Sequence, residues 1–128
     1  MSVDLNSEEQ AVIGQIERFS SKVLVPAAAE IDAKSRFATL HRPALAEMGI
    51  MGMNLPEAYG GIGLSGPALY CAVEAIAAAC GSTASMLTAH FLATDSLLLG
   101  ADEALKQRIL PAAAAGEALG AFALTEPM

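Results

Sequence analysis

The sequence has little positive charge: 7 Lys and Arg residues stand against 14 Asp and Glu, for a net charge of −7. Such a chain has no basic stripe with which to neutralise the phosphates of a nucleic acid or to bind an anionic lipid surface. Charged residues of either sign make up only 16% of the 128 residues, and 54% are hydrophobic. This composition argues against disorder and predicts one folded domain with a core of its own.

Cysteine is nearly absent as well. Cys71 and Cys80 fall in one expected helix, nine residues apart. At 1.5 Å per residue they would lie roughly 13 Å apart, which is too far for a disulfide. Neither has the spacing to other ligands that a metal site requires. We therefore predict two buried, inert thiols and no metal site.

The chain shows neither a leader peptide nor a lipid-facing span. Residues 1–9 are acidic and lack the apolar stretch of a signal or transit peptide. The longest central stretch free of Lys, Arg and Glu, residues 82–101, still carries Thr, Ser, His and Asp and is too polar for a lipid-facing helix. We expect a cytoplasmic protein, and the mean hydropathy of +0.47 suggests an exposed apolar interface.

Hydrophobic spacing predicts helices along most of the chain. Ser7 and Gln10 form a capping pair for the first helix, and Pro26 should kink or restart it. Asp102 caps the last helix, which Pro111 should interrupt. The fold is therefore predicted to be all-α, an up-and-down helical bundle over residues 1–120.

The end of the chain is predicted to differ from the bundle. Phe122 and Leu124 alternate with small residues, which indicates the first β-strand of a further domain at residues 121–128. Thr125 and Glu126 place a hydroxyl and a carboxylate at the exit of this strand, and Pro127 forbids further regular pairing. We expect the chain to stop inside a functional loop.

The helix expected between Thr83 and Leu99 is unusually polar. Ser85, Thr88 and Leu92 follow i, i+3, i+7 spacing and share one face. Their hydroxyls can contact a ligand or can bond back to the helix carbonyls, and the spacing favours the structural interpretation. His90 has no nucleophile or acid at a useful spacing, so a core or interface histidine is favoured over a catalytic one.

The run Gly60-Gly61-Ile62-Gly63 invites comparison with a phosphate-binding loop. It lacks the strand-then-helix context of a dinucleotide fingerprint and the Lys-Ser/Thr pair of a nucleotide P-loop. A tight, packed turn is the favoured interpretation.

These phrases together resemble one family. Pro-Glu-x-Tyr-Gly-Gly-x-Gly at residues 56–63, His90, Lys-Gln-Arg-Ile-Leu-Pro at 106–111 and Leu-Thr-Glu-Pro at 124–127 occur in the order found in the acyl-CoA dehydrogenases. The resemblance covers about Leu5 to Pro127. It implies the N-terminal helical domain of an FAD-dependent enzyme that oxidises acyl-CoA thioesters in fatty acid metabolism.

The resemblance also implies roles for particular residues. Phe122, Leu124 and Thr125 match the segment that contacts the flavin, and Ser85, Thr88 and Leu92 match the helix that lines the acyl pocket. The family's catalytic glutamate lies far downstream, so no catalytic residue and no metal ligand is assigned here. The resemblance further implies an electron-transfer flavoprotein as acceptor and a homotetramer or homodimer, while this chain alone is expected to be inactive.

Two kinds of alternative stay open. Within the same superfamily, the parent reaction could be acyl-carrier-protein dehydrogenation or flavin-dependent monooxygenation, since the helical domain is alike in these enzymes. In a different class, the chain could be a non-catalytic helical module whose apolar face binds a partner.

Overall fold

The computed structural model describes residues 3–126, and every regular element among them is helical. The all-α prediction is therefore confirmed. Contacts divide the chain into two compact units, one of Met1–Arg42 with Leu64–Met86 and the other of Pro43–Gly63 with Leu87–Met128. Pro127 and Met128, which end the predicted loop, lie outside the described residues.

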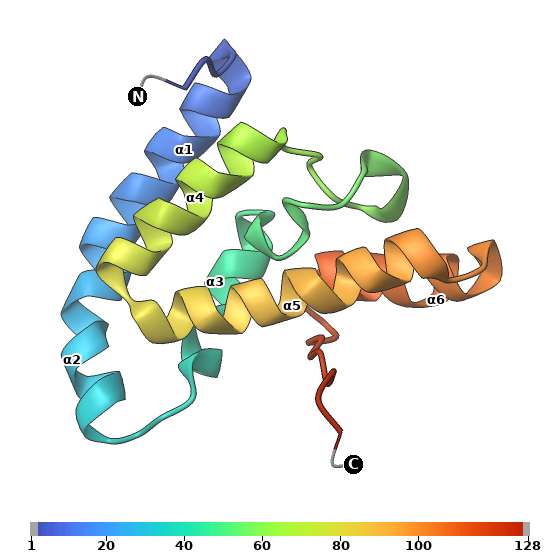
Figure 1. The fold of residues 1–128 in the computed structure, drawn as a ribbon. Helices are drawn as coiled ribbons and strands as arrows, with labels where there is room; N and C mark the ends of the chain where they lie inside the picture. The colour runs from blue at the N-terminus through green and yellow to red at the C-terminus, as the bar shows by residue number, and fades with distance from the viewer. Residues whose placement is uncertain (1–2, 127–128) are drawn as a thin grey trace. The chain divides into compact units, whose positions relative to one another are not determined.

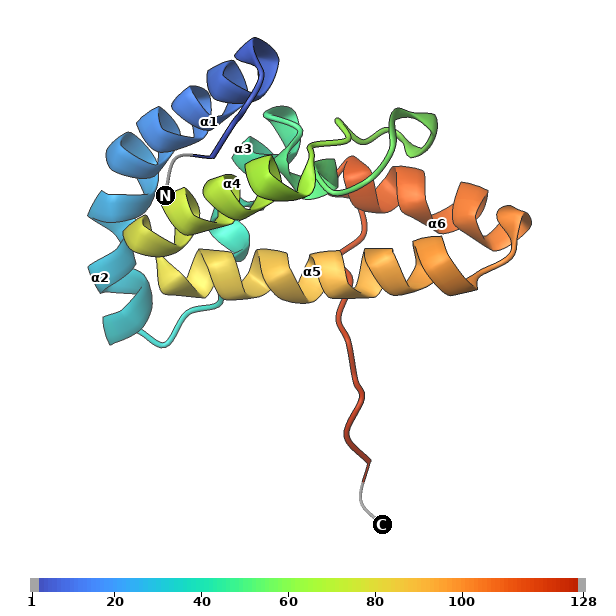
Figure 2. The same ribbon diagram turned by 45° about the horizontal axis from the view of Figure 1, so that its top comes forward.

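In the first unit, α1 (Ser7–Phe19) packs along α4 (Gly66–Ala79). Figures 1 and 2 show the two helices side by side and running in the same direction, so this pair is parallel rather than up-and-down. Both helices are amphipathic, and their apolar positions are buried: Ile13 and Ile16 in α1, and Ala68, Ala72 and Ile76 in α4.

The carboxylate of Glu9 accepts hydrogen bonds at the N-terminal ends of both helices. Asn6, rather than Ser7, caps α1: its side-chain oxygen accepts from the Glu9 N–H at 2.8 Å, and Glu9 Oε2 accepts from the Asn6 N–H at 3.1 Å. The capping pair is Asn6 and Glu9 because Glu9 stands three residues after an equally good capping side chain. Glu9 Oε1 also accepts from the Ser65 N–H at 3.2 Å, where α4 begins. Hydrogen bonds from the Ser65 side chain and the Asn6 backbone hold the pKa of Glu9 below its ordinary value.

The predicted disturbance at Pro26 takes the form of a wider helical turn. A π-helical segment, Ser20–Leu24, joins α1 to α2 (Val25–Ala33), and the Val25 N–H donates to the Ser20 carbonyl. Proline cannot donate to the carbonyl four residues earlier, and its ring clashes with it. Widening the turn by one residue lets the helix pass this point without breaking.

In the second unit, α6 (Glu103–Ala114) packs on an irregular loop that contains the 3₁₀ turns Ile50–Gly52 and Glu57–Tyr59. Leu55, Leu110 and Ala114 form a buried cluster against which Tyr59, Leu97 and Leu98 pack. Asp102 caps α6 as predicted, through the Leu105 N–H at 2.8 Å. Pro111 was expected to interrupt this helix, but α6 continues through it, because Leu110, Ala113 and Ala114 are buried around it.

The remaining helices are α3 (Arg42–Glu47), the short 3₁₀ turn Ala38–His41 and the long α5 (Gly81–Gly100). The helix α5 contributes residues to both units. Both cysteines are free thiols, with Cys80 buried and Cys71 half-buried. The prediction of a buried thiol therefore holds fully for Cys80 only.

The glycine-rich loop is packed so closely that one position admits no side chain. A Cβ on Gly61 would overlap the Leu55 carbonyl oxygen and lie 2.5 Å from the Gly52 carbonyl oxygen. We expect Gly61→Ala to lower the free energy of unfolding by about 3 kcal/mol or more, since backbone atoms cannot yield as a side chain could. Urea denaturation followed by circular dichroism measures this loss.

The matched control is Gly14→Ala in α1. A Cβ there meets only the Arg18 guanidinium, at an ordinary 3.4 Å. This variant should gain roughly 0.5–1 kcal/mol, because alanine is the better helix former. Equal effects of the two substitutions would contradict the packing argument.

Candidate functional site

The three residues assigned to an acyl pocket lie along one side of α5. Ser85, Thr88 and Leu92 are all exposed, and Leu92 keeps 52% of its surface accessible. The opposite side of the helix is buried through Thr83, Ala84, Met86, Leu87, His90, Phe91 and Thr94. The face predicted from i, i+3, i+7 spacing is therefore the outward face of the helix, where a ligand can reach it. Its contact with an acyl chain stays a prediction.

His90 is fully buried and hydrogen-bonded at both ring nitrogens. Its Nε2 lies 3.0 Å from the Met51 carbonyl oxygen, and its Nδ1 accepts from the Gly120 N–H at 2.9 Å. A carbonyl can only accept and an amide N–H can only donate, so the proton must be on Nε2 and Nδ1 must be bare. This geometry requires one neutral tautomer of the imidazole and supports the predicted core histidine.

Gly120 brings the chain end against α5. A Cβ at this position would lie 2.8 Å from the Ala93 Cβ, closer than real side-chain contacts. Only glycine therefore lets the backbone approach closely enough for its N–H to reach His90. Sequence reasoning missed Gly120, because a close approach between distant segments leaves no local pattern.

The segment after Gly120 carries the predicted flavin contacts on an irregular, exposed backbone. Phe122 is 42% exposed and Leu124 77% exposed, and Thr125 is exposed too. The predicted strand is wrong for the described residues 121–126, which form no regular element. Alternating apolar residues become a strand only when a neighbouring strand pairs with them, and the elements of the described chain are helices (Figures 1 and 2).

A second polar bridge ties the loop to α5. The Asn54 Nδ2 donates to Thr94 Oγ1 at 3.0 Å and to Asp95 Oδ1 at 2.8 Å. Thr94 is buried and itself donates to the Phe91 carbonyl at 3.1 Å. The hydrogen bonds at His90 and at Thr94, four residues apart on α5, thus hold the same loop to the same helix. The sequence offered no sign of the role of Asn54.

The Gly60-Gly61-Ile62-Gly63 run is a packed turn, as predicted. Its four successive amides all donate within the loop, to the carbonyls of Glu57, Pro56, Gly52 and Leu55. An anion-binding loop must instead aim several free amides at its ligand. This turn therefore has no amide left with which to hold a phosphate.

Tyr59 fastens the glycine-rich turn to α6. Its hydroxyl lies 3.1 Å and 3.0 Å from the two carboxylate oxygens of Glu103, and the Gln107 side-chain amide donates to the same carboxylate at 2.9 Å. Hydrogen bonds from Gln107 and Tyr59 hold the pKa of Glu103 below its ordinary value. The hydrogen bond to Glu103 raises the pKa of Tyr59. These hydrogen bonds stabilise the ionised form of the Glu103 carboxylate, so we interpret Glu103 as a structural contact rather than a general acid or base.

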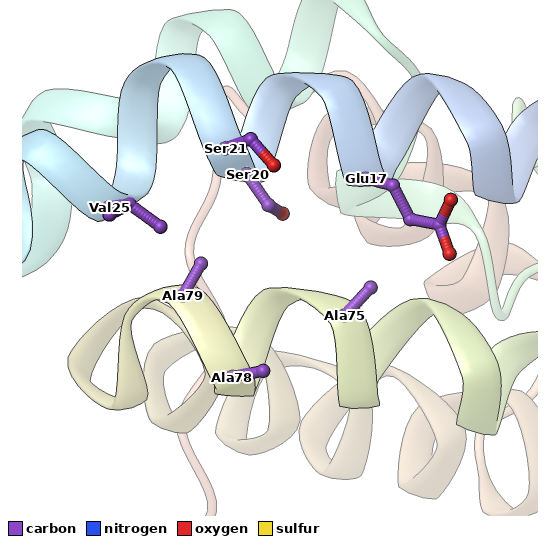
Figure 3. Close-up of a pocket in the computed structure, with 7 residues that line it drawn as sticks. All are labelled: Glu17, Ser20, Ser21, Val25, Ala75, Ala78 and Ala79. Atoms are coloured by element: carbon purple, nitrogen blue, oxygen red, sulfur yellow. The ribbon is translucent and has the colours of Figure 1, made fainter.

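The first unit has a shallow pocket of about 250 Å³ between the C-terminal part of α4 and the stretch from the end of α1 through the π-helical segment to the start of α2. Figure 3 shows its lining residues, which are Glu17, Ser20, Ser21, Val25, Ala75, Ala78 and Ala79. The Ser20 hydroxyl is buried beside it without a hydrogen-bond partner. None of the predicted site residues lines this pocket.

The described residues show neither a metal cluster nor a membrane span. Over residues 3–126, no three His, Cys, Asp or Glu side chains come together in a way that could hold a metal ion. In the same part of the chain, every helix is too short or too polar to cross a membrane.

Comparison with known proteins places these features in a family. Residues 6–117 match the family model described as acyl-CoA dehydrogenase, N-terminal domain. The chain is 37% identical to the probable acyl-CoA dehydrogenase YngJ of Bacillus subtilis, over 99% of this chain and 34% of that protein. It thus spans about a third of the length of the curated relatives it matches.

Solved structures agree with the sequence match. A structure of the electron-transferring flavoprotein of Acidaminococcus fermentans aligns with a TM-score of 0.90 and 30% identity, over 99% of this chain and 34% of that one. The acyl-CoA dehydrogenase of Bacillus anthracis complexed with FAD aligns with a TM-score of 0.88 and 31% identity, over 97% of this chain and 21% of that one.

The Tyr59–Glu103 contact predicts a pH-dependent stability. Glu103 has a lowered pKa in the fold, so its contribution is full above its ordinary value of 4.5 and is lost as the pH falls below it. Tyr59 has a raised pKa, so its contribution is full below its ordinary value of 10.0 and is lost as the pH rises above it. We expect Tyr59→Phe to lower the urea midpoint at neutral pH and to match the wild type in acid. A deficit that persists unchanged in acid would contradict this account.

Proposed function

We propose a function from the premise that this chain belongs to the acyl-CoA dehydrogenase N-terminal domain family. The chain is the helical part of a flavoenzyme that removes two hydrogens from the α and β carbons of an acyl-CoA thioester. Its exposed α5 face receives the acyl chain, and residues 122–125 lie against the flavin. The observation that carries the proposal is the family match over residues 6–117, which ends just before this exposed segment.

The chemistry of the α5 face suits an acyl thioester. Leu92 offers an apolar surface, and Ser85 and Thr88 bring hydroxyls to the same side of the helix. A fatty acyl thioester needs apolar contact along its chain and a small number of well-placed polar groups. The helix is held from behind by His90 and Thr94, so its outward face is presented on a rigid support.

The residues present fit the ring of FAD and do not fit its pyrophosphate. Phe122 and Leu124 expose apolar surface, and Thr125 adds a hydroxyl on the same exposed segment. The amides of the glycine-rich turn are all engaged within the loop, so this turn cannot cradle phosphates. When bound, the flavin supplies the acceptor for the hydride. This chain contributes ring contacts and orientation, and its glycine-rich turn takes no part in holding the phosphates.

The remaining roles belong to the whole protein. No residue of this chain is assigned as the base that removes the α-proton, and a catalytic carboxylate from elsewhere in the protein completes the reaction. We further propose an electron-transfer flavoprotein as the acceptor, a role that the likeness to the Acidaminococcus fermentans structure supports. A cytoplasmic homotetramer or homodimer completes the proposal.

The reaction is tested on the flavoprotein that carries this chain. It should be yellow as purified and should lose its oxidised-flavin absorbance anaerobically when a saturated acyl-CoA of suitable length is added. If only acyl-carrier-protein thioesters bleach the flavin, the substrate is an acyl group carried by the carrier protein and not an acyl-CoA. Oxygen-dependent product formation without bleaching would indicate a monooxygenase, and a protein that binds no flavin would favour a partner-binding module.

The proposed acyl-binding face of α5, formed by Ser85, Thr88 and Leu92, is tested by placing a larger side chain on it. Leu92→Trp should shift the preference toward shorter acyl chains by roughly tenfold in kcat/KM, because one or two methylenes of lost space cost this much in an apolar pocket. The flavin spectrum should not change. Ala77→Trp, at an exposed position of α4, is the matched control and should leave the preference as it is. An unchanged chain-length profile in Leu92→Trp would remove α5 from the acyl site.

A further inference from the structure

One buried side chain joins three separate stretches of the second unit. His90 belongs to α5, its Nε2 bonds to the loop at Met51, and its Nδ1 bonds to the backbone at Gly120. Met51 is fully buried, so the loop end of this link does not move freely. Gly120 is the point at which the chain leaves the helical body toward Phe122.

The bond to Gly120 is specific in both partners. Nδ1 can accept only in the tautomer that carries its proton on Nε2, and the Met51 carbonyl favours this tautomer by accepting a hydrogen bond from Nε2–H. Gly120 can come within 2.9 Å only because it has no Cβ to meet Ala93. The link therefore depends on Met51, His90 and Gly120 together, and its geometry fixes one backbone amide at one place on α5.

The segment beyond Gly120 has few contacts of its own to hold it. Ala118 still donates to the Ala112 carbonyl at 3.1 Å. Residues 121–126 form no regular element and are exposed. The exit point of this segment is thus set at Gly120, two residues before Phe122.

We propose that His90 is a positioning residue for the flavin-contacting segment. It does not touch the flavin. Through Gly120 it sets where Phe122, Leu124 and Thr125 are presented to the ring. The part of this inference that concerns the flavin rests on the proposed function. The hydrogen bond between Gly120 and His90 is a property of this chain alone.

Two substitutions that each mimic one ring nitrogen separate the two ends of the link. The side-chain oxygen of Asn can take the place of Nδ1, so His90→Asn can still accept from Gly120 and loses the bond to Met51. The side-chain nitrogen of Gln can take the place of Nε2, so His90→Gln can still donate to Met51 and loses the bond to Gly120. Both variants remove the ring, and core filling alone would disturb His90→Asn more, because Asn is smaller than Gln. That order is the opposite of the one expected for Gly120.

The first measurement is amide hydrogen exchange by NMR on the full 128-residue chain. The exchange of the Gly120 amide, divided by that of buried amides in α6, should rise roughly tenfold in His90→Gln and stay within about twofold of wild type in His90→Asn, as expected for loss of a buried hydrogen bond. Thr94→Val is the matched control: it removes the hydrogen bond from Asn54 to Thr94 on the same helix and should leave Gly120 protected. Equal Gly120 exchange in the Asn and Gln variants would overturn the proposal.

The second measurement is made on the holoprotein that carries this chain. His90→Gln should weaken FAD binding by roughly tenfold and shift the visible flavin spectrum, while His90→Asn should bind FAD and absorb as the wild type does. An unchanged FAD affinity and spectrum in His90→Gln, with Gly120 released, would overturn the positioning role and leave only an anchor. A wild-type protein without flavin would refute the proposed function instead, and the exchange result would still decide the His90–Gly120 link.

Discussion

The two hydrogen bonds of His90 are the constraint on which the second unit is built. A fully buried imidazole with one donor and one acceptor satisfied costs little, whereas either bond left open would leave a polar group without a partner in the core. Both partners are backbone groups, and at Gly120 the backbone comes this close only because the residue has no Cβ. The loop and the chain end are therefore placed by the main chain, and α5 serves as the common support.

The glycine-rich loop serves packing rather than ligand binding. Gly61 and Gly52 allow backbone to lie against backbone and against α6, where a Cβ on Gly52 would lie 2.8 Å from the Ala114 Cβ. Tyr59 then fastens the outer edge of the turn to Glu103. A loop made rigid in this way can support α5 from behind, which leaves the outward face of α5 for a substrate.

The sequence predicted the features that depend on local order. Helical spacing, the cap at Asp102 and the shared face of Ser85, Thr88 and Leu92 on α5 all arise from neighbours three or four residues apart. It also indicated the family through motifs such as Pro-Glu-x-Tyr-Gly-Gly-x-Gly, in which the close packing of Gly61 leaves no room for a side chain. It could not predict the Asn54 bridge or the approach of Gly120, because these join residues about 30 to 40 positions apart in the chain. The predicted strand failed because its formation depends on a partner strand, and the capping residue was misplaced by one position because Asn6 and Ser7 are both good caps.

In the first unit, one side chain serves the N-terminal ends of two helices. The carboxylate of Glu9 completes the cap of α1 with one oxygen and accepts a hydrogen bond from the N–H of Ser65, the residue just before α4, with the other. A single ionised group is thus shared by two helices that are 56 positions apart at this contact. Substitutions near Asn6 and near Ser65 would act through the same carboxylate, so their effects on stability would be coupled rather than additive. Sequence change at one helix start would accordingly limit the changes that are tolerated at the other.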